Sequence, residues 1–531
     1  MLKSSAFNTN KPTALLASLI KSTLSVGSMT FLSRVAGLAR DIVIARFFDA
    51  GDSTDAFFVA FKIPNFLRRL FAEGAFSLAF VPVLTEYRSQ HSAAQVKDLI
   101  DRVAGTLGVI LLILSLFGVL ASPVIITIVA AGFIDQPEKF NLTADMLRIT
   151  FPYILLISMT AMAGGILNTW KHFAVPAFTP VLLNLSMIGC AFWLSPHLDL
   201  PITALAWGVL LAGVVQLLFQ LPFLYAEGLL PKPAWGWRHE GVQKIIKLMI
   251  PALFGSSVAQ INLLFDTFIA SFLISGSVTW LYFSDRLLEF PLGVFGIALA
   301  TVVLPNLSEA HYKKGSKHFN HTLQWAVMLS LLIATPATIG LFLLSQPILV
   351  TLFEYGAFQN NDSMMAAYSL MAYSLGLPAM ILIKILASGF YARQDTRTPV
   401  RIGIQAMCLN MVLNIVFVLS MLKYDFIAPH VGLALATTAS AYFNAAMLAL
   451  TLKKKSIIEG FAVFALPVLK ILIACCAMSL VILWLSPAAE AWNQWQWFER
   501  AYQLGWLISS AILCYALMLR IMGIRRRHFA L

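Results

Sequence analysis

Two charged stretches inside long apolar runs decide the fold: Leu32-Ser33-Arg34-Val35-Ala36-Gly37-Leu38-Ala39-Arg40-Asp41 and Lys62-Ile63-Pro64-Asn65-Phe66-Leu67-Arg68-Arg69-Leu70-Phe71-Ala72-Glu73-Gly74. Each run is long enough to span a bilayer, yet each carries several cations. A charged side chain at the bilayer centre costs about 2.5–3.5 kcal/mol on insertion scales. We therefore expect these arginines to line a hydrated cavity inside a helix bundle, and such a cavity would bind an anion.

The composition indicates an integral membrane protein. Of 531 residues, 59% are hydrophobic and 12% are charged, whereas soluble proteins are about 45–50% apolar and about 25% charged. Apolar stretches recur at the length of about 20 residues that a helix needs to cross the hydrocarbon layer. This length favours a polytopic α-helical protein over a β-barrel, whose strands alternate with period two.

We predict fourteen transmembrane helices and no cleaved signal before Lys21. The predicted spans are 22–48, 55–84, 102–131, 142–170, 175–196, 201–226, 242–274, 278–308, 320–345, 363–392, 399–422, 427–452, 459–486 and 499–522.

The charges of the loops predict the orientation. Basic loops alternate with acidic or neutral ones, which is the positive-inside pattern, so both termini are expected in the cytoplasm. Residues 88–100 and the basic tail 525–531 are then inside, and residues 49–55 and 488–497 are outside. Because the net charge of +12 follows this alternation, it does not indicate a nucleic-acid partner.

An internal repeat is visible at an offset of 223 residues. The matched positions are Pro82 with Pro305, Glu86 with Glu309, Pro176 with Pro399 and Ser33 with Ser256. Six predicted spans separate equivalent points, so the repeats share one orientation. We expect two six-helix lobes related by a pseudo-two-fold axis along the membrane normal, with a cavity between them. The predicted parts are 1–231 (spans 1–6), 232–457 (spans 7–12) and 458–531 (spans 13–14 and the basic tail).

Further charged and polar residues near these arginines are candidates for a secondary role in the cavity or in gating. Arg69 and Glu73 are spaced as a helical i,i+4 pair, and Arg286 and Glu289 are three apart and could pair. Asn65 follows Pro64 and could satisfy a carbonyl that this proline frees. The candidates for the secondary role are Asp41, Asp55, Lys62, Asn65, Arg69, Glu73, Asp285 and Glu289.

The chain shows no motif of an enzyme. No HExxH sequence, phosphate-binding glycine loop or Asp-rich magnesium motif is present. The five cysteines lie in predicted helices, where small apolar packing is the usual role, so we expect neither disulfides nor a metal site. A membrane transferase acting on a prenyl phosphate would also need arginines; whether the purified protein changes the lipid covalently would distinguish it.

Four stretches resemble the MurJ/MviN family of the multidrug/oligosaccharidyl-lipid/polysaccharide exporter superfamily. They are residues 33–41 and 284–294, residues 389–400, and the highly specific run 54–77. The resemblance implies fourteen helices in two lobes plus an extra pair, and a transporter that flips lipid II, the undecaprenyl-pyrophosphate-linked peptidoglycan precursor. It also implies that the substrate-binding arginines are Arg34, Arg40, Arg68 and Arg286.

From this resemblance we expect a bacterial cytoplasmic-membrane protein without a cofactor. It would be a monomer that contacts membrane lipid and the cell-wall synthesis machinery. The alternatives are an exporter of another polyprenyl-pyrophosphate-linked saccharide and a cation-coupled drug antiporter, although an antiporter would need a carboxylate-rich cavity. We expect the membrane potential to drive turnover, because a cationic cavity moves in the field. A monovalent coupling cation is the competing hypothesis.

Overall fold

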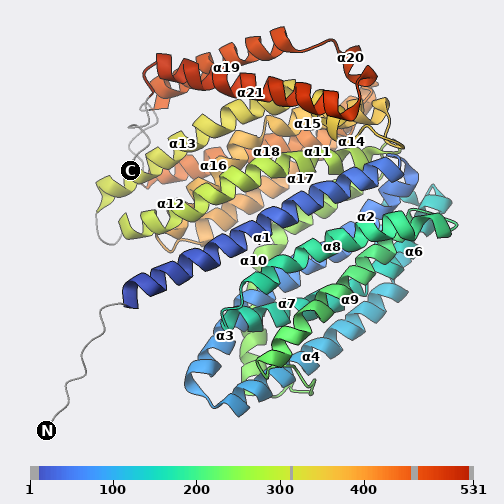
Figure 1. Cartoon of the computed structure of the whole chain (residues 1–531), viewed down its shortest axis with the longest axis vertical. Coiled ribbons are helices and arrows are strands. Elements are labelled where there is room, and N and C mark those ends of the chain that lie inside the picture. The colour runs from blue at the N-terminus through green and yellow to red at the C-terminus, as the bar shows by residue number, and fades with distance from the viewer. Residues whose placement is uncertain (1–10, 311–314, 456–463, 525–531) are drawn as a thin grey trace. The chain divides into compact units, whose positions relative to one another are not determined.

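The structure is a computed structural model that describes residues 11–310, 315–455 and 464–524, in which all regular secondary structure is helical (Figure 1). The first part of the chain forms α1 (Lys11–Phe47), α2 (Asp52–Arg68), the π-helical segment η1 (Arg69–Phe76), α3 (Ser77–Gln90), α4 (Ala93–Leu120), α5 (Ser122–Val129), the 3-10 turn η2 (Ala131–Phe133), α6 (Pro137–Thr150), α7 (Tyr153–Thr169), α8 (Ala174–Trp193), the 3-10 turn η3 (Ser195–His197) and α9 (Thr203–Ala226). The second part forms α10 (Glu240–Ala270), α11 (Ser277–Pro291), the π-helical segment η4 (Leu292–Ile297), α12 (Ala298–Glu309), α13 (Ser316–Leu343), α14 (Ser345–Phe353), α15 (Asn360–Ser374), α16 (Leu377–Tyr391), α17 (Arg397–Lys423), α18 (Val431–Lys454), α19 (Ala465–Leu485), α20 (Ala489–Gln494) and α21 (Trp497–Ile521).

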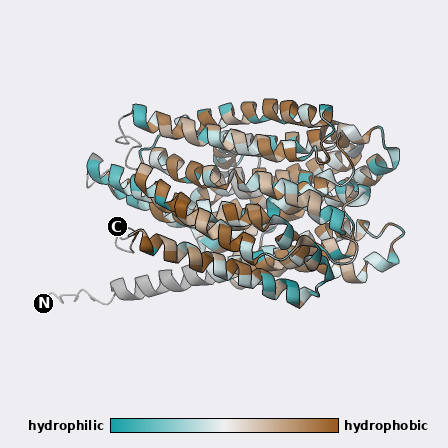
Figure 2. Ribbon diagram, turned by 90° about the horizontal axis from the view of Figure 1, so that it is seen from above, coloured by the Kyte–Doolittle hydropathy of each residue, from teal (hydrophilic) through white to brown (hydrophobic). Residues whose placement is uncertain are grey.

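Eleven helical stretches of the described residues are long and apolar enough to cross a membrane. Figure 2 shows hydrophobic residues along much of these helices and hydrophilic residues gathered toward their ends. The eleven stretches coincide with eleven of the predicted spans. The other three predicted spans fall on α1, on α2–η1–α3 and on α10, which carry many of the charged residues considered below. The all-helical membrane fold is therefore confirmed, whereas the count of fourteen spans stays a prediction.

Contacts divide the chain into two compact units. Unit 1 consists of the described residues up to Ile44 together with Val59–Thr127 and Glu138–Gln260. Unit 2 consists of Ala45–Phe58, Ile128–Pro137 and the described residues from Ile261 onward. The division at residues 231 and 457 and the pseudo-two-fold symmetry were inferred from the sequence repeat, and they stay predictions.

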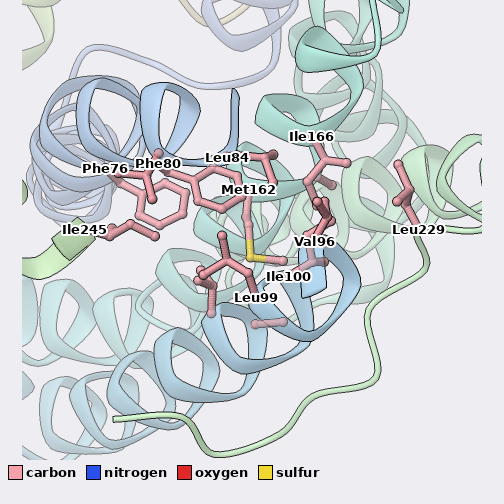
Figure 3. Packing of buried hydrophobic residues seen from close by; sticks show 14 of the residues in the cluster. Phe76, Phe80, Leu84, Val96, Leu99, Ile100, Met162, Ile166, Leu229 and Ile245 are labelled. Atoms are coloured by element: carbon pink, nitrogen blue, oxygen red, sulfur yellow. The ribbon is translucent and has the colours of Figure 1, made fainter. Parts of the chain in front are cut away.

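The core of unit 1 is a cluster of aliphatic and aromatic side chains from five parts of the chain (Figure 3). Phe80 and Leu84 of α3 pack with Leu99 of α4 and Ile166 of α7, and all four are fully buried. Burial of one such side chain stabilises a fold by about 1.5–3 kcal/mol in water. The α4 helix begins at this cluster with a capping box, in which Ser92 and Gln95 bond each other's backbone.

Unit 2 contains two short segments from the first half of the chain. Phe58 at the end of Ala45–Phe58 stacks on Tyr282 with ring centroids 3.8 Å apart. In the second segment, the Gly132 amide donates to Ser271 Oγ at 3.0 Å, and a Cβ added at Gly132 would lie 2.3 Å from the Ser271 carbonyl oxygen. Glycine is therefore required there for the close approach of the two backbones.

The two π-helical segments follow the sequence repeat. The first begins at Arg69 and the second at Leu292, and 292 − 69 = 223, the offset predicted from the sequence. The first segment joins α2 to α3, and the second joins α11 to α12. Because π-helical turns are rare and often mark functional positions, their equal spacing supports the alignment of these two stretches.

The last two long helices belong to unit 2. Helices α19 and α21 run side by side (Figure 1). Tyr515 of α21 donates to the carbonyl of Leu332 in α13 at 2.8 Å, and the buried Arg500 donates to the carbonyls of Val350 and Glu354 at 3.1 and 3.2 Å. Arg500 thereby satisfies carbonyls at the end of α14 that the helix leaves unpaired.

Candidate functional site

In α1, a buried ion pair lies about two turns beyond Arg34. Arg40 and Asp41 are 3% and 1% exposed, and the guanidinium donates to Asp41 Oδ1 from Nη2 at 2.6 Å and from Nε at 3.0 Å. Removing either partner of a buried pair leaves an uncompensated charge and is strongly destabilising. Arg40 and Asp41 are therefore held together, and the charge of Arg40 is opposed by that of its neighbour.

The backbone beside Arg34 is held by a residue that the sequence did not single out. Asn184 of α8 is buried, and its Nδ2 donates to the carbonyl of Ser33 at 3.3 Å and to that of Pro180 at 3.3 Å. Arg34 itself is half-buried, and no hydrogen bond or ion pair joins it to a described residue. A polar amide within the apolar run after Pro180 was the available signal for Asn184.

The end of α2 carries a second arrangement. Arg68 donates to Asn65 Oδ1 from Nε at 3.0 Å and from Nη2 at 2.8 Å. We expected Asn65 to bond a carbonyl freed by Pro64, and that expectation was wrong: its amide oxygen accepts from Arg68, and its amide nitrogen bonds no described residue. Because an amide is neutral, these two bonds orient the guanidinium without cancelling its charge.

The remaining candidates of α2 and η1 are placed as follows. Lys62 and Arg69 are half-buried. The side chain of Glu73 lies outside the described part, so its predicted pair with Arg69 stays a prediction.

Asp55, at the first turn of α2, belongs to unit 2 and is 1% exposed. Its carboxylate accepts from the Gly276 amide at 2.8 Å and from the amide and hydroxyl of Thr279 at 2.9 and 2.7 Å. These groups begin α11, where unpaired amides and the helix dipole favour a negative charge. Asp55 therefore fixes the start of the helix that carries Arg286.

In α11, the predicted pair of Arg286 and Glu289 is confirmed. Arg286 Nη1 lies 2.8 Å from Glu289 Oε2, and the two side chains are 35% and 40% exposed. Asp285 is half-buried beside them. Exposed ion pairs of this kind contribute only about 0–1 kcal/mol. Arg286 could therefore exchange Glu289 for another anionic group at a low cost in free energy.

Arg34, Arg40 and Arg68 belong to unit 1, and Arg286 belongs to unit 2. Within each unit the structure brings charged groups together as described. The convergence of all four arginines on one cavity stays a prediction.

A buried polar cluster in unit 2 was also missed by the sequence analysis. Asn414 of α17 donates from Nδ2 to Asp266 Oδ1 at 2.6 Å and to Asn410 Oδ1 at 3.0 Å. The buried Oδ1 of Asn414 accepts no hydrogen bond from the described residues. Carboxylate and amide oxygens are ligands of hard cations. No group of three or more His, Cys, Asp or Glu residues with metal-binding geometry occurs among the described residues.

Comparisons with known proteins agree with this arrangement. The family model described as "Lipid II flippase MurJ" matches residues 44–502. A "Probable lipid II flippase MurJ" of Vibrio cholerae is 49% identical over 514 residues, which cover 96% of this chain and 97% of the relative.

Solved structures show the same fold. A structure described as "Lipid II flippase MurJ, inward closed conformation" is 29% identical with a TM-score of 0.77, and covers 94% of this chain and 98% of that chain. An inward-facing multidrug resistance MATE family transporter of the MOP superfamily is 15% identical with a TM-score of 0.65, covering 82% of this chain and 98% of that chain. The second likeness shows the fold alone. The family match, the high identity to a relative over nearly the whole of both chains and the structural match together establish that the chain belongs to the MurJ family of lipid II flippases.

Proposed function

We propose that this chain flips lipid II from the cytoplasmic to the outer leaflet of the bacterial inner membrane by alternating access. The observation that carries the proposal is the family match over residues 44–502. The arginines supply the chemistry, because a pyrophosphate with a large saccharide headgroup does not cross hydrocarbon unaided. Guanidinium groups bind phosphate oxygens in pairs of parallel hydrogen bonds.

In this proposal, Arg34, Arg40, Arg68 and Arg286 bind the pyrophosphate. Asn65 holds the guanidinium of Arg68 at 2.8–3.0 Å, and Glu289 competes with the substrate for Arg286. Asp41, Asp55, Lys62, Arg69, Glu73 and Asp285 have the secondary roles predicted from the sequence.

We further propose fourteen spans, two lobes related by a pseudo-two-fold axis, and both termini in the cytoplasm. The protein would act as a monomer that performs no covalent chemistry and contacts the cell-wall synthesis machinery. The alternation of basic and acidic loops supports this topology.

The membrane potential is the proposed driving force. One net charge moved across the full field is worth about 2.3 kcal/mol per 100 mV, so one or two charges bias the cycle tenfold or more. An empty cationic cavity is drawn to the negative cytoplasmic side, and bound pyrophosphate offsets that pull. Coupling to a cation, for which the cluster around Asp266 offers oxygen ligands, is the competing mechanism.

The experiment is flipping of fluorescent lipid II by the purified chain in proteoliposomes. We expect lipid II to move and to be recovered chemically unchanged, while a cationic drug is not transported. Covalently altered lipid would instead indicate a transferase, and transport of the drug without lipid II would indicate an antiporter. Clamping the potential to zero with potassium and valinomycin should stop net flipping; undiminished flipping under a sodium or proton gradient would favour ion coupling.

A further inference from the structure

The segment between α9 and α10 (residues 227–239, here called the linker) is fixed on the side of α4. The Lys232 amide donates to Asp101 Oδ1 at 2.7 Å, and the Ala234 amide donates to the Asp101 carbonyl at 3.0 Å. The Gly236 amide donates to Thr106 Oγ1 at 3.0 Å. The amides of every second residue from 232 to 236 are thus bonded to one stretch of α4, so the linker has a defined course.

Glycine permits this close course. A Cβ added at Gly105 of α4 would lie 2.2 Å from the Ala234 carbonyl oxygen, and one added at Gly236 would lie 2.4 Å from Arg102 Cβ. Neither distance is compatible with a side chain. At one end the linker is also held by Leu229, which is buried at the edge of the unit 1 core (Figure 3).

Two tryptophans project from the fixed linker. The rings of Trp235 and Trp237 stack with centroids 6.3 Å apart and planes 12° apart, and the residues are 57% and 43% exposed. The Trp237 carbonyl accepts from Gln243 Nε2 at 2.6 Å. Exposed apolar patches mark sites where another molecule binds, and these two exposed rings form an apolar patch.

The position of this surface along α4 indicates which molecule that is. The contacted residues, Asp101 to Thr106, lie where α4 changes from charged residues to a continuous apolar run that begins at Val103. Five residues of helix cover about 8 Å, which matches the depth of about 5–8 Å of the headgroup layer on one side of a bilayer. Tryptophans are enriched at that depth.

The charges beside the rings indicate the kind of lipid. Lys232 and Arg238 are exposed on the linker. The nearby acidic groups are bonded to cations, since Lys97 bonds Asp101 and Arg102 Nε lies 2.7 Å from Asp98 Oδ2. The two exposed carboxylates nearest in sequence, Glu227 and Glu240, lie outside residues 232–238, and Glu227 Oε1 lies 2.7 Å from His172 Nε2. Residues 232–238, which carry the two tryptophans, contain two cations and no carboxylate.

We propose that the linker is a binding surface for anionic lipid headgroups, in which Trp235 and Trp237 enter the headgroup layer and Lys232 and Arg238 select negatively charged lipid. This surface shares no residue with the arginines of α1, α2 and α11 and does not depend on what the chain transports. Its role would be to fix the depth of this end of unit 1 in the membrane. Each cation near an anionic surface is expected to favour anionic lipid about fivefold.

The test uses the full chain in nanodiscs. The fluorescence emission of the unchanged chain minus that of the variant Trp235→Phe/Trp237→Phe is the emission of the two linker tryptophans, here called the difference emission. We expect this difference emission to be quenched by phosphatidylcholine brominated near the glycerol, and more strongly by brominated phosphatidylglycerol. Lys232→Gln/Arg238→Gln should abolish the preference for phosphatidylglycerol and keep the quenching by phosphatidylcholine. Gly105→Ala should displace the linker and reduce both.

Trp193→Phe provides the matched control, because Trp193 is 79% exposed at the end of α8 in the same unit and lies outside the linker. Its difference emission should show no preference for phosphatidylglycerol. Quenching of Trp235 and Trp237 by aqueous iodide but by neither brominated lipid would overturn the proposal and indicate a water-facing surface or a protein partner. If the two brominated lipids quench equally, and if Lys232→Gln/Arg238→Gln leaves this quenching unchanged, the proposed selection of anionic lipid is overturned.

Discussion

The end of α2 in unit 1 and the middle of α11 in unit 2 each hold an arginine through a side chain three positions away. Arg68 bonds the amide oxygen of Asn65, whereas Arg286 bonds the carboxylate of Glu289. Each arginine precedes a π-helical segment, and the two segments begin 223 residues apart. The amide orients one guanidinium and leaves its charge in place, while the carboxylate opposes the charge of the other.

This difference suggests a division of labour between the two arginines. We propose that Arg68, which is oriented by a neutral amide, attracts pyrophosphate before contact, because the Coulomb energy of a charge falls only as the inverse of distance. In the same proposal, Arg286 binds substrate when the substrate displaces Glu289, so its bond depends on substrate position. A carrier needs both features, since it has to bind its substrate and then release it.

The largest effect is expected when an arginine is removed from both regions of the chain. Arg34→Ala/Arg286→Ala should abolish lipid II flipping in proteoliposomes, because each bond between an ionised donor and acceptor contributes about 1.5–3 kcal/mol. Lysine at either position should restore flipping in part, since it cannot form the paired hydrogen bonds. Equal amounts of protein in the membrane serve as the control, and full activity of the double alanine variant would exclude these arginines from the site.

A smaller effect tests the neutral partner of Arg68. Asn65→Asp places a carboxylate where the amide oxygen now accepts at 2.8 and 3.0 Å, so it should convert the region into a copy of the Arg286–Glu289 pair. We expect lipid II affinity to fall about tenfold, by analogy with other charge-assisted bonds. Asn65→Ala, which removes the orientation and keeps the charge, should cost less. If both variants lose affinity equally, the neutrality of Asn65 has no role.

The converse change tests Glu289. Glu289→Gln should remove the competitor for Arg286 and tighten lipid II binding about threefold, because exposed ion pairs are worth about 0.2–1 kcal/mol. Release should slow, so the maximal flipping rate should fall as affinity rises. Isothermal titration and a single-turnover flipping assay measure the two effects. Weaker binding in this variant would show that Glu289 supports the substrate.

The smallest effect concerns an ion pair away from these arginines. A hydrogen bond from Lys455 and two from Thr398 lower the pKa of Asp395 from 3.8 to about 2. Since the folded-state pKa is the lower one, the ionised carboxylate stabilises the fold above about pH 4, and this contribution is lost as pH falls toward about 2. Because the pair is partly exposed, Asp395→Asn should lower the melting temperature by only about 1 °C at neutral pH.

Thermal unfolding in detergent across this pH range measures that difference. It should shrink below about pH 4, and Lys455→Gln should give the same loss, with no further loss in the double variant. A difference that stays constant down to about pH 2 would show that the carboxylate charge does not contribute.

The spacing of residues along the sequence was sufficient to predict part of the candidate site. The pair of Arg286 and Glu289 follows from helical geometry. The predicted repeat offset of 223 residues equals the separation of the two π-helical segments, although the sequence did not predict the segments themselves. Hydropathy predicted the eleven apolar spans because burial in lipid depends on composition over a whole window.

Contacts between distant segments were beyond local spacing. Asn184 bonds Ser33 from a separation of 151 residues, and Asp55 caps α11 from 221 residues away. Such bonds depend on how helices pack in three dimensions, which a hydropathy window does not contain. The neutral partner of Arg68 was missed for another reason: the amide of Asn65 can donate as well as accept, and the sequence does not say which of the two it does.

The most direct test of the central claim is the affinity of the purified chain for lipid II in nanodiscs, compared with Arg68→Ala and Arg68→Lys. Loss of charge-assisted hydrogen bonds predicts that alanine weakens binding about 10- to 100-fold and that lysine lies between alanine and the wild type. Melting temperatures of the three proteins should agree, which separates binding from stability. Equal affinities in all three would contradict the claim that this guanidinium binds the pyrophosphate.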